Sequence, residues 1–217
     1  MTDRGDLRAR LDAARLYLAL ETGAAHVVEP ALRGGVDMVQ LRDKTAADDV
    51  VVSAGRELRE LCHRHGALFV VNDRPDLALA CGADGVHLGQ EDATVEQVRA
   101  EVGDDVVIGL STHSEEQIVA AEASDADYYA VGPVHETPTK PGRPAVGLRL
   151  VRHAASVASK PWFAIGGIDP ENVAQVAAAG ARRIVVVRAI RDAGDPAGAA
   201  RLLRTALEQE AAVGPAR

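Results

Sequence analysis

Amide and basic side chains cluster at the end of an apolar run, in the segment VDMVQLRDK at residues 36–44. If this run is a strand, Gln40 and Arg42 share one face of it. Met38 then lies deeper on the same face, and Lys44 lies just beyond the strand. An amide, a guanidinium fork and an ammonium can together hold a diphosphate. An Arg-Asp-Lys turn taken alone is more often a solvated surface turn, but the buried type of strand before it favours an anion site.

Two aspartates are candidate metal ligands. Asp73 and Asp92 each follow a predicted strand, or the loop just after it, so that their carboxylates can lie close together. Mg²⁺ in proteins usually binds one or two carboxylates together with substrate phosphate oxygens and water. Each aspartate could instead cap the helix that follows it, one starting near Pro75 and the other after Ala93. Their position beside the predicted diphosphate site favours the role of Mg²⁺ ligand.

A second anion site is predicted nearer the C-terminal end of the chain. In the segment IGGI at 165–168, backbone N–H groups can approach an anion, and a predicted helix follows with its positive end forward. The N–H groups of Val187 and Arg188 could complete this site. Adjacent glycines also permit tight packing and are a weak signal by themselves. Their position favours phosphate, because phosphate sites after the seventh and eighth strands recur in (β/α)8 barrels.

The elements that must position these residues follow from an alternation of short apolar runs with longer amphipathic stretches. Near-continuous apolar runs are typical of parallel strands that are covered on both faces. A doubly wound sheet would have a glycine-rich first turn, and LETGAAHV at 20–27 lacks the G-x-G-x-x-G pattern. The sequence therefore predicts an α/β fold, a (β/α)8 TIM barrel, as a single domain spanning 1–217.

Eight strands and eight helices make up this predicted barrel. The strands are expected at 15–20, 36–42, 67–72, 85–88, 106–110, 127–132, 162–166 and 183–188, and the helices near 24–33, 46–64, 75–81, 94–101, 114–123, 147–158, 170–178 and 196–211. The Asp-Pro-Glu at 169–171 is typical of a helix start. Three prolines and a glycine exclude a helix or a central strand over 134–146, which we expect to be an active-site lid. The chain ends, 1–6 and 212–217, are expected to fray.

Composition excludes several classes of protein. The net charge is −8 and the chain has no basic run, so the clustered positive surface of a nucleic-acid-binding protein is missing. We expect neither a membrane span nor a signal peptide, since no apolar run is long enough. Only two cysteines, Cys62 and Cys81, are present, which indicates a reducing compartment and a cytoplasmic protein. Aromatic residues make up 3%, which predicts a core of Val, Ile, Leu and Ala.

In a barrel, the C-terminal ends of all strands meet at one mouth, where Ser111 would join the residues above. The segments at this mouth, taken in order, resemble the thiamine phosphate synthase family: VQLRDK, NDRPDLALACGADGVHLGQED, GLSTH, YYAVGPVHETPTKPG, AIGGI and VVVRAI. The resemblance covers almost the whole chain. Enzymes of this family join 4-amino-2-methyl-5-pyrimidinylmethyl diphosphate to 4-methyl-5-hydroxyethylthiazole phosphate, or to its carboxylated form, and release diphosphate.

The resemblance implies a role for each matching residue. Mg²⁺ would be bound by Asp73 and Asp92, and Ser111 would contact the pyrimidine. The pyrimidine diphosphate would be surrounded by Gln40, Leu41, Arg42, Asp43, Lys44, Asn72 and Lys140. The thiazole phosphate would be held by Thr137, Pro138, Thr139, Gly167, Val187 and Arg188. The residues implied to be catalytic are Arg42, Lys44, Ser111 and Lys140.

The resemblance also implies a mechanism without a protein nucleophile. The pyrimidine 4-amino group can push electrons toward the methylene carbon, so that diphosphate leaves before the thiazole nitrogen attacks. The loop carrying Lys140 would close over the site and exclude water. Where many family members have Ser or Ala at the end of the eighth strand, this chain has Arg188. Its guanidinium could either reinforce the phosphate site or form a salt bridge elsewhere, and the sequence leaves both open.

Two other functions stay open at this point. One is a thiazole tautomerase, an isomerase on the same barrel, in which His113 and His135 could act as acid or base. That enzyme lacks the diphosphate and metal residues, and their joint presence here argues against it. The other is a non-catalytic barrel that binds thiamine precursors, which would need the phosphate pocket but not the metal pair. The sequence is compatible with a homo-oligomer and leaves the oligomeric state open.

Overall fold

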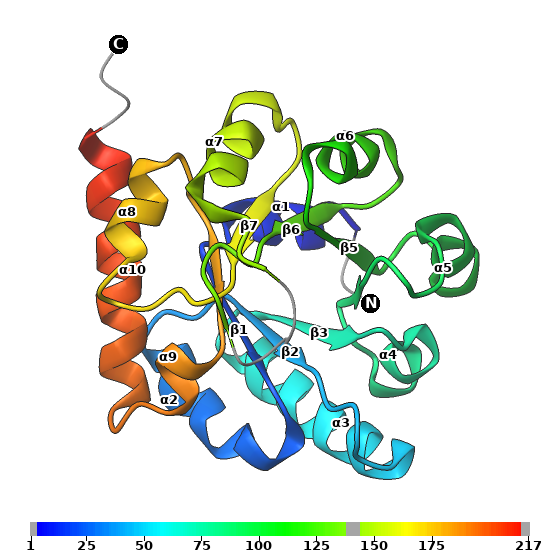
Figure 1. The fold of residues 1–217 in the computed structure, drawn as a ribbon. Helices are drawn as coiled ribbons and strands as arrows, with labels where there is room; N and C mark the ends of the chain where they lie inside the picture. Colours follow the sequence, from blue (N-terminus) through cyan, green and yellow to red (C-terminus); the bar gives the residue numbers. More distant parts are fainter. Residues whose placement is uncertain (1–3, 138–143, 214–217) are drawn as a thin grey trace.

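The computed structural model describes residues 4–137 and 144–213. Eight parallel strands close into a barrel in sequence order, with helices around it (Figure 1). The strands are β1 (Leu16–Leu20), β2 (Met38–Leu41), β3 (Leu68–Asn72), β4 (Gly85–Leu88), β5 (Val107–Thr112), β6 (Tyr128–Val131), β7 (Trp162–Ile165) and β8 (Ile184–Val186). The predicted (β/α)8 barrel is therefore confirmed.

The helices that cover the strands largely match the predicted ranges. They are α2 (Val28–Arg33), α3 (Asp48–Arg64), α4 (Pro75–Cys81), α5 (Val95–Val102), α6 (Glu115–Ala123), α7 (Gly147–Val157), α8 (Val173–Ala178), α9 (Arg188–Arg191) and α10 (Pro196–Val213). In the part of the chain that the structure describes, no helix is both long and apolar enough to cross a membrane.

Three of the differences from the predicted boundaries bear on the site, and the others are shifts of one or two residues. A 3₁₀ helix, η1 (Thr22–Val27), precedes α2, so the single helix expected over 24–33 is two elements. α8 begins later than expected, because the Asp169 carboxylate caps an irregular turn by accepting the N–H groups of Glu171 and Asn172 at 2.9 and 3.2 Å. β8 ends at Val186, and Arg188 starts α9 instead of continuing the strand.

The barrel interior differs from the aliphatic core that composition predicts. Tyr17, Tyr128 and Phe163 meet there edge to face, with ring centroids 5.5 to 6.3 Å apart. All three side chains are fully buried. Aliphatic side chains dominate instead between the strands and the outer helices, where Leu18 and Val39 lie. A low aromatic content says how many rings a chain has but not where they gather.

The N-terminal helix α1 (Arg4–Ala13) has no counterpart in the sequence prediction. Leu7 and Leu11 are buried in the same cluster as the interior residue Tyr17, so the helix closes the N-terminal end of the barrel (Figure 1). Residues 4–6 of the segment expected to fray belong to this helix, and residues 1–3 lie outside the described residues. At the other end, 212–213 continue α10.

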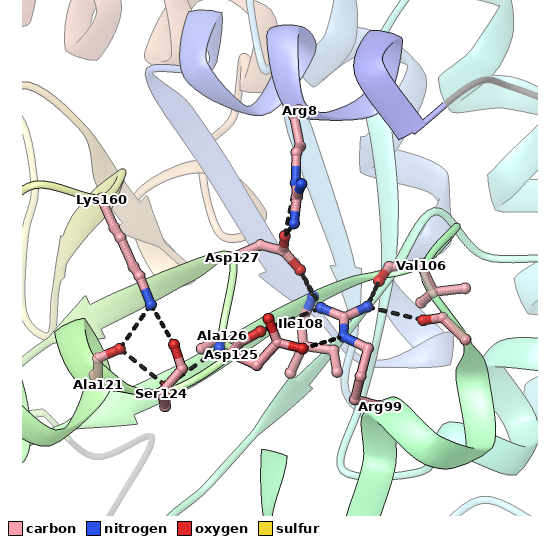
Figure 2. Close-up of polar contacts among 11 residues, drawn as sticks. Arg8, Arg99, Val106, Ile108, Ala121, Ser124, Asp125, Ala126, Asp127 and Lys160 are labelled. Atoms are coloured by element: carbon pink, nitrogen blue, oxygen red, sulfur yellow. Dashed lines mark hydrogen bonds and ion pairs between the residues drawn. The ribbon is translucent and has the colours of Figure 1, made fainter. Parts of the chain in front are cut away.

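Aspartates stand directly before three even-numbered strands: Asp37 before β2, Asp84 before β4 and Asp127 before β6. Each carboxylate accepts a backbone N–H near the start of the preceding strand, at 3.0, 2.8 and 2.9 Å, from Leu16, Phe69 and Ile108 respectively. Each also contacts basic or imidazole side chains, which are Arg204 for the first, His63 for the second, and Arg8 and Arg99 for the third. Figure 2 shows the third of these sites, where α1 is joined to the barrel.

Candidate active site

The C-terminal ends of the strands open into two adjoining cavities. The first cavity, of about 270 Å³, lies over β2, β3 and β4. The second cavity, of about 360 Å³, lies over β6, β7 and β8. Ser111, Ile165, Val185 and Val187 line both, so the two cavities share a wall. A mouth of this shape can hold two molecules in contact.

The first cavity has a basic edge supplied by β2 and the loop after it. Gln40 is buried, Arg42 is half-buried and Lys44 is exposed, and all three line the cavity. The Lys44 Nζ lies 3.1 Å from a carboxylate oxygen of Asp73. Met38, beneath Gln40, faces the barrel interior. The alternation read from VDMVQLRDK is thus the one the barrel adopts.

The carboxylate of Asp43 points into the turn and not into the cavity. It accepts the Thr22 hydroxyl at 2.6 Å and the backbone N–H groups of Thr22, Thr45 and Ala46 at 3.2, 3.1 and 3.0 Å. The Thr22 hydroxyl, with help from these backbone donors, holds the pKa of Asp43 well below its usual range. Asp43 therefore ties the loop after β2 to the start of η1 and fixes the basic residues on either side of it.

Two carboxylates meet opposite the basic edge. Asp73 follows β3 in the left-handed backbone region, with φ 61°, a conformation that costs a non-glycine residue on the order of 1 kcal/mol and that gathers at functional sites. Burial raises the pKa of Asp73, the adjacent Asp92 carboxylate raises it further, and Lys44 lowers it. Two carboxylates this close repel each other unless positive charge lies beside them. The single ammonium of Lys44 balances only one of the two negative charges.

The structure removes the helix-capping explanation for both aspartates. α5 begins with a capping box made by Thr94 and Gln97, while Asp92 accepts the Gly89 N–H at 2.6 Å. α4 begins after Arg74 without a side-chain cap. Asp73 and Asp92 therefore contact each other instead of serving as helix caps.

Backbone at two glycines lines the second cavity. Gly166 and Gly167 have φ 104° and 63°, which favours glycine. A Cβ on Gly166 would lie 2.5 Å from Pro133 Cα, and one on Gly167 would lie 2.7 Å from His135 Cβ. The Asn172 Nδ2 donates to the Gly167 carbonyl at 2.8 Å. The glycines therefore do allow close packing, and the same backbone is exposed to the cavity.

Arg188 supplies positive charge to the second cavity, which also contains two carboxylates. Asp169 is engaged by the backbone of its own turn. Asp192 accepts Arg191 Nε at 2.6 Å, and this contact, more than burial, sets its pKa below the usual value. Both carboxylates have hydrogen-bond partners, and Arg188 acts on Asp192 only through its charge, so the exposed Arg188 side chain can face an anion.

The other predicted residues fall into three groups. Asn72 and Ser111 line the first cavity, and Ser111, Thr137 and Val187 line the second. Leu41 points the other way, because its side chain packs between the strands and the outer helices, so it could offer a ligand only its backbone. Outside the described residues lie Pro138, Thr139 and Lys140.

Polar residues beneath the first cavity were missed by the sequence prediction. Tyr17 and His87 line the cavity floor, and both contact the hydroxyl of Tyr128. One sequence feature could have indicated His87. In GVHL it is the polar member of an otherwise apolar strand, and it shares the inward face with Gly85.

Comparisons with known proteins show the family of the chain. Residues 16–190 match the thiamine monophosphate synthase family. The chain is 52% identical over 213 residues to the thiamine-phosphate synthase of Thermobifida fusca, covering 95% of this chain and 98% of that protein. It is 55% identical over 194 residues to that of Gloeobacter violaceus, covering 88% of this chain but only 57% of that longer protein. It also resembles the solved thiamine phosphate pyrophosphorylase from Pyrococcus furiosus, with TM-score 0.85, 35% identity, and 94% and 98% of the two chains covered. The chain therefore belongs to the thiamine monophosphate synthase family.

Proposed function

We propose that this chain is a transferase that condenses 4-amino-2-methyl-5-pyrimidinylmethyl diphosphate with 4-methyl-5-hydroxyethylthiazole phosphate, or its carboxylated form, to thiamine phosphate and diphosphate. The observation that carries the proposal is the meeting of Asp73 and Asp92 beside Lys44, in a cavity that shares a wall with a glycine-lined one. The first cavity suits a metal-assisted diphosphate, and the second suits a monophosphate.

Mg²⁺ fits the first cavity on the chemistry of its donors. Burial and the neighbouring Asp92 raise the pKa of Asp73, and a bound dication would relieve that repulsion. Among the residues that the structure describes, no group of three or more His, Cys, Asp or Glu side chains is placed to hold a metal. Phosphate oxygens and water would complete the ligand set, as is usual for Mg²⁺. When bound, the ion would neutralise charge on the departing diphosphate.

The side chains at the mouth bind and orient the substrates in this proposal. Arg42 and Lys44 contact the diphosphate oxygens, and their charge stabilises the leaving group. Ser111 lies in the shared wall, where it contacts the pyrimidine close to the incoming thiazole. The Gly167 backbone and Arg188 hold the thiazole phosphate. The substrate's own amino group helps to expel diphosphate, so alignment and charge are what the protein must provide.

The segment 134–146 serves as the lid in this proposal. Its two described ends are anchored, because the Val134 N–H donates to the Ile165 carbonyl at 2.8 Å and the Val146 N–H donates to the Pro133 carbonyl at 2.8 Å. These anchors lie beside the glycines of the second cavity. Lys140, with Pro138 and Thr139, would close over both substrates and exclude water from the pyrimidine cation.

A two-substrate assay tests the proposal. The purified chain with both substrates and MgCl2 should form thiamine phosphate and release diphosphate, EDTA should stop the reaction, and added Mg²⁺ should restore it. Absence of product, with substrates that a known family enzyme turns over, contradicts the proposal. Isomerisation of the thiazole alone would identify a tautomerase, and calorimetric binding without turnover would identify a binding protein.

A cytoplasmic location and exclusively small-molecule substrates belong to the same proposal. Cys62 and Cys81 are buried free thiols, a state that a reducing compartment preserves. Fractionation of the source cells, with a known cytosolic enzyme as marker, tests the location.

A further inference from the structure

A chain of hydrogen bonds runs beneath the first cavity and joins two of its lining residues. Gln40 Nε2 donates to the Tyr17 hydroxyl at 2.6 Å, and that hydroxyl lies 3.2 Å from the Tyr128 hydroxyl. The Tyr128 hydroxyl lies 3.1 Å from Nδ1 of His87, whose Nε2 lies 3.0 Å from Oγ of Ser111. The most exposed of these five residues is 6% exposed. At this depth an unpaired polar group is costly, so the links hold one another in place.

Gly109 makes the central link possible. A Cβ at this position would lie 2.1 Å from the ring of Tyr128. In the barrel register Gly109 is the partner of both His87 on β4 and Tyr128 on β6. The phenol therefore crosses β5 at the glycine to reach the imidazole. Burial raises the pKa of Tyr17 and of Tyr128, so both hydroxyls keep their protons at neutral pH.

The protons of this chain are ordered in one direction. A phenol has one proton, so a hydroxyl that accepts from one neighbour donates to the next. Since Gln40 donates to Tyr17, the Tyr17 proton goes to Tyr128. The Tyr128 proton then goes to Nδ1 of His87, which leaves the imidazole proton on Nε2 for Ser111. The Ser111 hydroxyl proton is not used within the chain, and neither is the side-chain oxygen of Gln40.

We infer that Tyr17, Tyr128 and His87 are positioning residues that make Ser111 a hydrogen-bond donor, and Gln40 an acceptor, toward the first cavity. Such a pair matches a ring edge with an acceptor nitrogen beside an exocyclic amino group, which is the edge of a 4-aminopyrimidine. In a 4-oxopyrimidine the ring N–H donates and the carbonyl accepts, so both contacts are mismatched. The inference rests on the proposed function and adds to it the selection of the amino over the oxo pyrimidine.

The phenylalanine variant of Tyr128 isolates this effect. Tyr128→Phe removes the middle hydroxyl of the chain and leaves Gln40 and Ser111 in place. Tyr129→Phe is the matched control, because it makes the same change on the same strand, but that ring packs in the outer core and takes no part in the hydrogen-bond chain. Thermal melting should show both variants folded.

Calorimetry with Mg²⁺ and without thiazole measures the selection directly. The ligands are 4-amino- and 4-oxo-2-methyl-5-pyrimidinylmethyl diphosphate. The wild type and Tyr129→Phe should bind the amino compound about 100-fold more tightly, since two buried contacts are mismatched in the oxo compound. Tyr128→Phe should lower this ratio to about tenfold or less, because Gln40 and Ser111 can then reorient independently.

The possible outcomes distinguish failure of the inference from failure of the proposed function. A Tyr128→Phe ratio equal to that of the wild type, or a wild type that binds both compounds equally, overturns the inference and leaves the proposed function standing. A wild type that binds neither compound contradicts the proposed function as well. In steady-state kinetics, Tyr128→Phe should raise KM for the pyrimidine diphosphate and leave KM for the thiazole phosphate unchanged. A purely structural role of Tyr128 would not separate these two constants.

Discussion

The two ends of the barrel treat their carboxylates in opposite ways. At the closed N-terminal end, Asp37, Asp84 and Asp127 each accept a backbone N–H and contact a basic or imidazole side chain (Figure 2). At the mouth, Asp73 lies against the carboxylate of Asp92. Negative charge is thus balanced where the barrel is sealed and left in excess where substrates enter. Excess charge costs stability in the free protein and becomes favourable once a cation arrives.

The largest expected effect is on activity at the mouth. Asp73→Asn should lower kcat/KM about 1,000-fold, since it removes a ligand of the proposed Mg²⁺ and with it the neutralisation of the leaving group. Its melting temperature should not fall, because the lost charge is one that burial and Asp92 already disfavour. Two-substrate kinetics and thermal melting check both points. Asp48→Asn, at an exposed ion pair with Arg74, is the control and should keep full activity. If Asp73→Asn were active but unstable, the carboxylates at the mouth would serve stability as those at the closed end do, and the contrast in charge between the two ends would be wrong.

A substitution at the closed end should lower stability and leave activity unchanged. Asp127→Asn removes the buried one of the two carboxylates that pair with Arg99 and leaves only the exposed Asp125. It should lower the free energy of unfolding by about 2 kcal/mol. The kcat of the folded variant should stay at the wild-type value. Denaturant unfolding and the two-substrate assay measure the two quantities. A normal stability with reduced kcat would mean that this network serves the mouth and not the seal.

The pH dependence of stability should also have opposite signs at the two ends. The pKa of Asp73 is raised in the folded state, so the folded protein holds the proton of this carboxyl more tightly than the unfolded chain does. The contribution of Asp73 to the stability of the fold therefore falls as pH rises above the ordinary pKa of 3.8. Burial alone would raise the pKa of Asp127, but the Ile108 N–H and two arginines lower it below the ordinary value of 3.8. The stability that Asp127 contributes to the fold is therefore present above pH 3.8 and lost in acid. Without divalent ions at pH 7, Asp73→Asn should be more stable than the wild type and Asp127→Asn less stable. Both differences should shrink toward acid pH, and differences of the same sign would contradict the contrast.

The smallest expected effect concerns the link between α1 and the barrel. The Arg8 side chain is 45% exposed, so its ion pair with Asp127 is largely screened. Arg8→Ala should lower the free energy of unfolding by about 0.5 kcal/mol, measured by denaturant unfolding. A loss several times larger would show that charge holds α1 in place more than Leu7 and Leu11 do.

Local periodicity was enough to predict the barrel and much of its mouth. The alternation of apolar runs predicts eight strands, and strand alternation places Gln40 and Arg42 on one inward face. Asp73 and Asp92 could be placed together because adjacent parallel strands end at the same rim. Their role as Mg²⁺ ligands stays a prediction. These properties depend on neighbours in the chain, which a sequence displays directly.

Other features were decided only by the tertiary structure. The Asp43 carboxylate turns to Thr22 at the start of η1, so this side chain braces the basic residues beside it. The expected contact of Asp43 with a substrate stays a prediction. The Asp residues before the even-numbered strands form a repeat without a local signal in the sequence, because their partners come from different helices. The fourth even-numbered strand breaks this repeat, since Arg183 precedes β8.

The interior hydrogen-bond chain shows why contacts across the barrel do not follow from local sequence patterns. Tyr17 and Tyr128 are 111 residues apart, yet their hydroxyls meet. The sequence by itself determined that each strand has an inward face and which residues lie on it. Barrel closure, with its register and the space left by Gly109, decided which inward side chains meet across the interior. That choice depends on all eight strands together, and so no local pattern could determine it.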